Sequence, residues 1–97
     1  QRQMYVAVLE QQVVGTASLD QAVVRSVFVS PHYQGRGIGQ QLMARLKDAA
    51  IAAQIAELRV PSSLTAESFY AQLGFEKVRD EYHGAERTVI MALRLDD

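Results

Sequence analysis

The sequence predicts an α/β protein of the α+β kind, in which two helices pack on a mixed, mostly antiparallel sheet that contains one parallel pair of strands. Three observations lead to this prediction. Residues 4–29 are rich in β-branched residues and are broken by short polar turns. Residues 38–53 change to an apolar spacing of three and four, and residues 55–95 return mainly to short apolar runs. The expected order of elements is β-β-β-α-β-α-β-β.

Three β-rich runs open the chain and predict an antiparallel meander. They lie at residues 4–9, 13–19 and 22–29. The polar residues 10–12 are typical of a hairpin turn, and Asp20 with Gln21 supplies the second turn. Because Pro31 has no backbone N–H to give to a neighbouring strand, the third strand should end at this point.

The clearest helix begins at Ile38. Apolar residues recur there at spacings of three and four and therefore share one helix face: Ile38, Leu42, Leu46, Ala49 and Ala53. A short strand at residues 55–60 follows, and Pro61 should close it. A strand, a helix and a second strand joined in this way form a right-handed crossover, so residues 22–29 and 55–60 should run parallel.

A second helix is expected at residues 65–73. Its buried side would carry Ala66, Phe69, Tyr70 and Leu73. Gly74 is placed to be the left-handed residue that ends this helix, with Phe75 folding back as the accompanying apolar contact. Two closing strands should follow at residues 75–82 and 88–95, around a turn at residues 83–87.

Composition limits the classes of function. The chain has 97 residues, ten basic and eleven acidic side chains, and a formal net charge of -1, so no overall field attracts nucleic acid or an anionic membrane. It has no cysteine and only two histidines, which predicts no metal site. No apolar run is long enough to span a membrane, and the N-terminus lacks a signal-peptide profile, so a cytoplasmic protein is expected.

Residues 34–40 place three glycines between the end of a strand and the start of a helix. The first N–H groups of a helix lack intrahelical partners and lie at the positive end of its dipole, so they bind anions. Gly35, Gly37 and Gly39 can adopt positive φ and let a diphosphate approach, and Arg36 can add a charged contact. The alternative is that the glycines only shape a tight turn and that Arg36 is a solvated surface residue.

Two other phosphate motifs do not fit this loop. A Walker loop needs Gly-Lys followed by Ser or Thr, which the chain lacks. A dinucleotide fingerprint that starts at Gly35 and Gly37 needs a third glycine at position 40, where Gln40 stands.

The spacing Gln34-x-x-Gly37-x-Gly39 resembles the acyl-coenzyme A signature of the GNAT superfamily of N-acetyltransferases. A second stretch, "AESFYAQLGF" at residues 66–75, resembles the A-x-x-F-Y-x-x-x-G-F helix and strand start of the same superfamily. The resemblance extends over residues 5–95 and implies a sheet whose central parallel strands splay apart. It also implies an enzyme that moves an acetyl group from acetyl-CoA to a primary amine of a small molecule or peptide.

The resemblance also implies which residues bind acetyl-CoA. The diphosphate would lie on the backbone amides of residues 34–40, and the pantetheine arm would pair with residues 27–29, where a backbone N–H would polarise the acetyl carbonyl. Ser63 stands where many members carry an asparagine that binds the pantetheine. The complete cofactor set is Val27, Phe28, Val29, Gln34, Gly35, Arg36, Gly37, Ile38, Gly39, Gln40 and Ser63.

Tyr70 is the catalytic residue that the resemblance implies, as the general acid beside the departing thiolate. Spacing alone favours packing of Tyr70 on an apolar helix face, and only the resemblance points to a catalytic role. The general base is not evident, because some members carry a glutamate where Val23 stands here. His83 and Glu81 are the nearest candidates, and a water relay is the alternative.

The resemblance implies a single acyl-CoA N-acyltransferase-like domain over residues 1–97, truncated at its N-terminus, because members usually begin with a strand and two helices before the strand that residues 4–9 resemble. This strand would be an exposed edge, so a homodimer is a further hypothesis. Two rival functions stay open. One is a non-catalytic acyl-CoA-binding domain or a fragment of a larger acetyltransferase, and the other is a small interaction module with a structural glycine loop.

Overall fold

The computed structural model describes residues 2–95 and contains a six-stranded sheet and two α-helices in the expected order. The elements are β1 (Arg2–Leu9), β2 (Gln12–Asp20), β3 (Val23–Val29), a 3-10 turn η1 (Pro31–Tyr33), α1 (Ile38–Ala52), β4 (Glu57–Ser62), α2 (Glu67–Gln72), β5 (Glu76–His83) and β6 (Glu86–Arg94). The predicted fold class is therefore confirmed.

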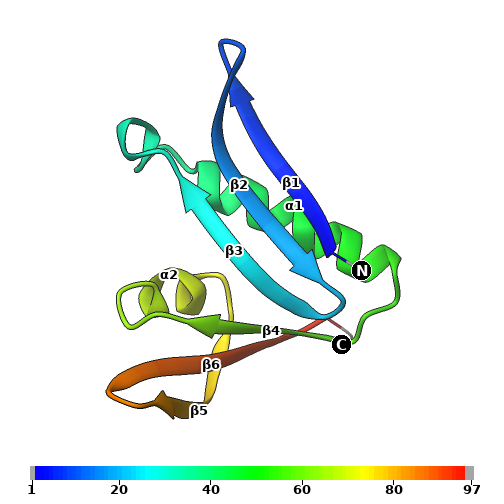
Figure 1. The fold of residues 1–97 in the computed structure, drawn as a ribbon. Helices are drawn as coiled ribbons and strands as arrows, with labels where there is room; N and C mark the ends of the chain where they lie inside the picture. Colours follow the sequence, from blue (N-terminus) through cyan, green and yellow to red (C-terminus); the bar gives the residue numbers. More distant parts are fainter. Residues whose placement is uncertain (1, 96–97) are drawn as a thin grey trace.

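The sheet has the strand order β1-β2-β3-β4-β6-β5 and divides at its centre (Figure 1). Every neighbouring pair is antiparallel except β3 and β4, which run parallel. These two strands share one residue pair, Val23 opposite Arg59, and the Arg59 N–H donates to the Ala22 carbonyl at 2.9 Å. Beyond this pair the two strands separate like the sides of a wedge, as predicted.

A bulge in β3 lies close to the point where the strands separate. Ala17 pairs with Val27 and Leu19 pairs with Val24, so β3 has one residue more than β2 in this interval. A bulge bends a strand and increases its twist. The direction of β3 therefore changes here, which helps to carry its end away from β4.

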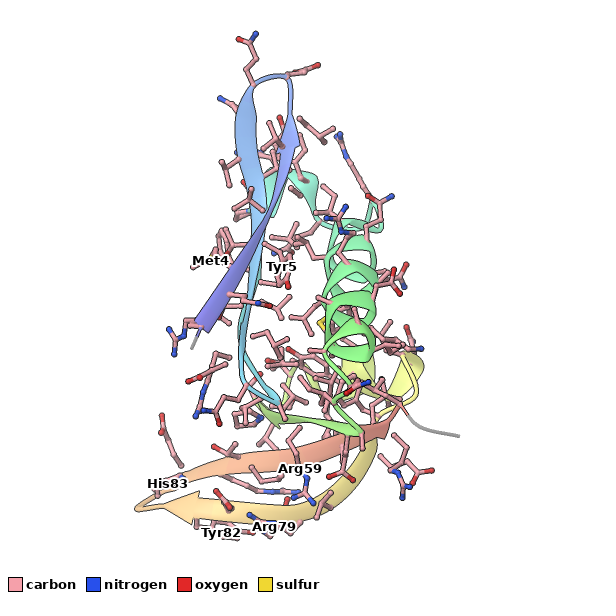
Figure 2. The ribbon with its side chains drawn as sticks, turned by 90° about the vertical axis from the view of Figure 1, so that its right-hand side faces the viewer. Met4, Tyr5, Arg59, Arg79, Tyr82 and His83 are labelled. Carbon is pink, nitrogen blue, oxygen red and sulfur yellow. The ribbon has the colours of Figure 1, made fainter. Side chains whose placement is uncertain are left out.

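Helix α1 covers one face of β1, β2 and β3 (Figures 1 and 2). Its buried residues are Ile38, Leu42, Met43, Leu46 and Ala50. The predicted stripe was therefore wrong in its last turn, where Ala49 is only half buried and Ala53 is the exposed C-cap. The buried positions instead recur every four residues from Ile38 to Ala50. This spacing keeps the buried side chains facing the sheet over the whole helix, whereas the predicted spacing does not.

Gly15 of β2 fixes how closely α1 can lie on the sheet. A Cβ at this position would lie 3.1 Å from both Ile38 Cγ2 and Leu42 Cδ1, and 3.2 Å from the Phe28 carbonyl oxygen. The absence of a side chain thus lets the first turn of α1 pack directly on the strands. This contact positions the loop that precedes the helix.

Several boundaries differ from the predicted ones, since β1 begins at Arg2 rather than at residue 4 and β4 at Glu57 rather than at residue 55. β4 continues through Pro61, which pairs with Ile90 of β6, because β4 has already separated from β3 and needs no N–H on that side. Helix α2 has only six residues and begins at Glu67 rather than at residue 65. The last hairpin turns at Gly84 and Ala85, so β5 and β6 are longer than predicted at this end.

One apolar cluster joins both parts of the sheet. It includes Leu46 of α1 and Leu58 of β4, both completely buried, together with Phe75 after α2. Phe75 is 3% exposed, its N–H donates to the Tyr70 carbonyl at 3.1 Å, and the preceding Gly74 has φ +104°, as the predicted helix end requires. No helix within residues 2–95 is long and apolar enough to cross a membrane.

Candidate functional site

The loop between β3 and α1 is built around two left-handed glycines. Gly35 and Gly37 both have φ +80°, as predicted, and Gly37 is the N-cap residue of α1. No side chain caps this helix start, so its first backbone N–H groups are left for another acceptor. The loop is anchored to the sheet because the Ser30 N–H donates to the Val14 carbonyl at 2.7 Å.

Gly39 has a different role from the predicted one. It lies in the first turn of α1 and does not adopt positive φ. A Cβ at Gly39 would lie 3.3 Å from Cζ of Phe69 and 3.7 Å from Cγ2 of Val29. The missing side chain therefore leaves room between α1, α2 and the end of β3.

A pocket of about 640 Å³ opens at this position. Its lining residues come from the end of β3, the first turn of α1 and the segment that leads into α2 with its first turn, elements that Figure 1 labels. Its lining residues are Val27, Val29, Tyr33, Gln34, Gly35, Gly37, Ile38, Gly39, Gln40, Thr65, Ala66 and Phe69.

Most residues predicted to bind the cofactor line this pocket, but three do not. Phe28 is 58% exposed and alternates with the pocket-lining Val27 and Val29 along β3. Arg36 lies over the ring of Tyr33, with its Cζ 5.1 Å from the ring centroid.

The third of these residues, Ser63, accepts a hydrogen bond from the Ala66 N–H at 3.3 Å and lies 3.2 Å from the Thr65 hydroxyl. Its hydroxyl therefore helps to organise the turn that enters α2. This contact was not predicted, because only the resemblance, and no local pattern, singled out Ser63.

Four lining residues were not predicted as site residues. Ala66 and Phe69 belong to the second motif, so their spacing could have indicated them. Tyr33 and Thr65 lie in turns, where no periodicity indicates the direction of a side chain.

Gln34 connects the glycine loop to the end of the neighbouring strand. Its side-chain Nε2 donates to the Val29 carbonyl at 3.1 Å. This bond holds the loop against β3, and the contact between Arg36 and Tyr33 lies within the loop itself. The loop is therefore shaped before any ligand arrives.

Tyr70 is buried beside the pocket rather than lining it. Its side chain is 6% exposed, and its ring meets Phe69 and Phe75 edge-on, with centroid distances of 5.1 and 5.5 Å. Burial raises the pKa of the Tyr70 hydroxyl, because removal from water disfavours the phenolate. The hydroxyl therefore keeps its proton at neutral pH.

The two candidate bases lie near the end of β5. Glu81 accepts hydrogen bonds from Arg79 Nε at 3.1 Å and Nη2 at 2.6 Å, and its other carboxylate oxygen is 3.9 Å from His83 Nε2. The His83 side chain is exposed. Within residues 2–95, no group of three or more His, Cys, Asp or Glu side chains is arranged to hold a metal ion.

The sequence and the fold are both similar to those of known acetyltransferases. A model of the acetyltransferase (GNAT) domain matches residues 1–94. The chain is 32% identical over 79 residues to the uncharacterized N-acetyltransferase YafP of Escherichia coli (strain K12), a match that covers 81% of this chain and 49% of YafP. The chain thus spans about half the length of this relative.

Two solved structures share the fold over nearly the whole chain. The GCN5-related N-acetyltransferase of Rhodopseudomonas palustris superimposes with a TM-score of 0.91 at 27% identity, covering 97% of this chain and 62% of that one. The yncA protein of Salmonella typhimurium, solved with its cofactor acetyl-CoA, gives a TM-score of 0.81 at 25% identity, covering 97% and 65%. The chain therefore belongs to the GNAT family of acetyltransferases.

Proposed function

We propose that this chain transfers an acetyl group from acetyl-CoA to a primary amine of a small molecule or peptide, within a single acyl-CoA N-acyltransferase-like domain. The observation that carries the proposal is the pocket at the start of α1. It combines uncapped helix N–H groups, two left-handed glycines and the open end of β3. Acetyl-CoA would supply an activated acetyl thioester, whose sulfur leaves as a thiolate when the C–S bond breaks.

The shape and chemistry of the loop fit a diphosphate. A Cβ at Gly35 would meet nothing within 4 Å, and one at Gly37 would meet only Gln40 Oε1, at 3.7 Å, so the backbone faces open space. Backbone N–H groups at a helix start, with the dipole behind them, are suited to phosphate oxygens. The guanidinium of Arg36 adds positive charge at the same loop.

Tyr70 is the proposed proton donor to the thiolate. Because burial raises its pKa, the hydroxyl is protonated under the conditions in which the thiolate forms. The edge-on contacts with Phe69 and Phe75 restrict the ring to one orientation. A fixed, protonated hydroxyl is what a general acid needs.

The proton of the attacking amine has two candidate acceptors on β5 and a third in water. The Glu81 carboxylate already accepts two hydrogen bonds from the guanidinium of Arg79. The His83 side chain is exposed, and its Nε2 lies 3.9 Å from Glu81 Oε1. We therefore place His83 ahead of Glu81, with water as the alternative acceptor.

One relative supports the choice of donor, and the matching family model supports the choice of reaction. The Salmonella protein, 25% identical, was solved with acetyl-CoA, and the family model that matches residues 1–94 describes acetyltransferases. Neither comparison identifies the amine. The acceptor class thus follows from the proposed chemistry, which needs a nucleophilic nitrogen at the open side of the wedge between β3 and β4.

Binding and turnover test the proposal separately. Isothermal titration with coenzyme A should show one site, and saturating ligand at about a hundred times its dissociation constant should stabilise the fold by about 2.7 kcal/mol. Acetyl-CoA with a panel of primary amines should release thiol. Absence of any binding would overturn the proposal, whereas binding without turnover would favour the non-catalytic acyl-CoA-binding alternative.

A matched pair of tyrosine variants tests the acid. Tyr70→Phe should lower the turnover rate by about a hundredfold and leave the affinity for coenzyme A unchanged. Tyr82→Phe makes the same chemical change at a side chain that is 66% exposed on β5, and it should have no effect. If Tyr70→Phe retains full activity, the hydroxyl is not the proton donor.

A further inference from the structure

Tyr33 lines the pocket beside the glycine loop, and no step of the proposed reaction uses it. It is the last residue of η1, and its N–H donates to the Ser30 carbonyl at 2.8 Å. The Ser30 N–H in turn donates to the Val14 carbonyl of β2. The ring of Tyr33 is partly buried against the apolar core. Its backbone is thus tied to the sheet, and its ring is held by packing.

The side chain of Arg36 rests on this ring. Its Cζ lies over the ring of Tyr33, 5.1 Å from the ring centroid. A cation within about 6 Å of a ring centroid is attracted by the negative face of the ring. Arg36 itself is exposed and stands between the left-handed Gly35 and Gly37, which have no side chains to pack against it. The ring therefore restricts a long side chain that would otherwise sample many rotamers.

A ring face holds a guanidinium without consuming its hydrogen bonds. The N–H donors of arginine lie in the plane of the guanidinium and point outward from its edges. A carboxylate partner would occupy these donors and neutralise the charge, whereas a ring face does neither. Arg36 thus keeps both the charge and the planar fork of donors that phosphate oxygens bind.

We propose that Tyr33 is a positioning residue, whose ring holds the Arg36 guanidinium beside the pocket so that it meets the diphosphate of coenzyme A already in place. Gly35 and Gly37, on either side of Arg36, both line the pocket. A side chain that is ordered before binding loses less conformational freedom when the ligand arrives. The inference rests on the proposed function for the identity of the ligand, but its test needs only a diphosphate.

Two other roles of the same contact predict different results. If Arg36 has to leave the ring to reach the phosphates, removal of the ring should strengthen binding. If Tyr33 touches the ligand itself, removal of its ring should weaken binding whether or not Arg36 is present. The sign of the effect and its dependence on Arg36 therefore separate the three roles.

Calorimetric titration with two probes, coenzyme A and inorganic diphosphate, measures the effect. Tyr33→Leu removes the ring and keeps an apolar side chain, and it should weaken the binding of both probes by about two- to fivefold. Tyr33→Phe keeps the ring face and should retain the wild-type affinity. Tyr82→Leu makes the same change at the 66% exposed tyrosine of β5 and should have no effect. Circular dichroism should show all three variants folded.

A double-mutant cycle tests whether Tyr33 acts through Arg36. Arg36→Ala should weaken diphosphate binding by about tenfold, because a charge-assisted contact is lost. When Arg36→Ala is already present, Tyr33→Leu should have no further effect. Arg45→Ala removes an exposed arginine of α1 and serves as the control. Additive effects of Tyr33→Leu and Arg36→Ala, or tighter binding by Tyr33→Leu, overturn the proposal.

A positioning role also predicts which kinetic constant changes. Tyr33→Leu should raise KM for acetyl-CoA and leave kcat unchanged, because the proposed proton donor Tyr70 is not altered. Acetyl-pantetheine lacks the diphosphate, so wild type and Tyr33→Leu should use it equally well. A lower activity of Tyr33→Leu with acetyl-pantetheine would show a general loss of structure and would count against positioning.

The two probes keep this inference distinct from the proposed function. Coenzyme A that binds without coupling between Tyr33 and Arg36 overturns the inference and leaves the proposed function intact. Diphosphate that binds with the coupling, in a chain that does not bind coenzyme A, supports the inference and overturns the proposed function. Failure of the wild-type chain to bind either probe overturns both.

Discussion

The two parts of the sheet contribute to the candidate site by different means. The part made of β1, β2, β3 and α1 contributes mainly backbone, through the glycine loop and the end of β3. The part made of β4, β5, β6 and α2 contributes side chains, because Phe69 of α2 lines the pocket and Tyr70, the proposed acid, is buried beside it. They meet at the single pair Val23 and Arg59 and then separate.

This difference indicates where each part can tolerate change. In the first part, the conformation of Gly35 and Gly37 matters more than any side chain, since both need positive φ. In the second part, the proposed roles depend on side-chain groups, such as the Tyr70 hydroxyl, rather than on backbone conformation. Substitutions on the two sides should therefore separate binding, chemistry and stability.

The largest expected effect is the loss of core contacts, and it tests whether the two parts unfold together. Leu46 of α1 and Leu58 of β4 are both completely buried in the same cluster. Leu46→Ala and Leu58→Ala should each lower the free energy of unfolding by about 2–5 kcal/mol. Because one core joins both parts, each variant should unfold in a single transition in urea. Two separate transitions would show that the parts are independent.

The sequence predicted the fold well because its periodicities are clear. The spacing of Ile38, Leu42 and Leu46 fixed the long helix, and Gly74 marked the end of the second. Pro61 misled the prediction of β4, since a proline normally ends a strand. Its tolerance depends on the separation of β3 from β4, which is a property of the whole sheet and not of the local sequence.

The part of the candidate site that backbone groups form could be predicted from the sequence. The part that depends on side-chain packing could be predicted less well. Gly35 and Gly37 stood out because glycines with positive φ before a helix suit either a tight turn or an anion site, and both have φ +80°. Gly39 was predicted as a site residue for the wrong reason. The need for glycine at this position comes from the close approach of Phe69, which is thirty residues later in the chain. Tyr33 and Thr65 depend on turn geometry and had no recognisable pattern.

The second prediction compares two glycines of similar conformation, one in each part of the sheet. Gly37 has φ +80° in the loop before α1, and Gly84 has φ +64° in the turn between β5 and β6. Neither would meet a backbone or apolar neighbour with an added Cβ. Gly37→Ala and Gly84→Ala should each lower the free energy of unfolding by about 1 kcal/mol, because alanine is strained at positive φ.

Only one of these variants should affect ligand binding. Gly37→Ala should weaken coenzyme A binding at least severalfold by calorimetry, since the loop must shift to relieve the strain. Gly84→Ala should bind with the wild-type affinity. Equal affinities in both variants would mean that the glycine loop does not hold the ligand.

A smaller effect is expected on the free energy of unfolding at alkaline pH, and it arises from Tyr70 in the part made of β4, β5, β6 and α2. Burial raises the pKa of Tyr70 in the folded protein above its value of about 10 in the unfolded chain. Between these two values the folded state binds the extra proton, so the stabilisation is complete below pH 10 and is lost as the pH rises through the folded pKa. Urea unfolding from pH 8 to 10.5 should show this decline, and it should be shallower in Tyr70→Phe. Identical slopes would contradict the burial argument.

The smallest expected effect is on the free energy of unfolding at acidic pH, and it again distinguishes the two parts of the sheet. The Lys77 hydrogen bond, at 3.1 Å from the ammonium nitrogen to Asp80 Oδ2, lowers the pKa of Asp80, and Arg87 lowers it further. Since the folded pKa lies below the unfolded value of about 3.9, the stabilisation is present above that value and is lost as the pH falls through the folded pKa. Asp80→Asn should remove this part of the acid dependence, whereas Asp48→Asn on α1 should not.

Because Asp80 lies at the surface, 1 M salt should reduce the difference between wild type and Asp80→Asn. A difference that persists unchanged in salt would instead indicate that packing, and not charge, gives Asp80 its role.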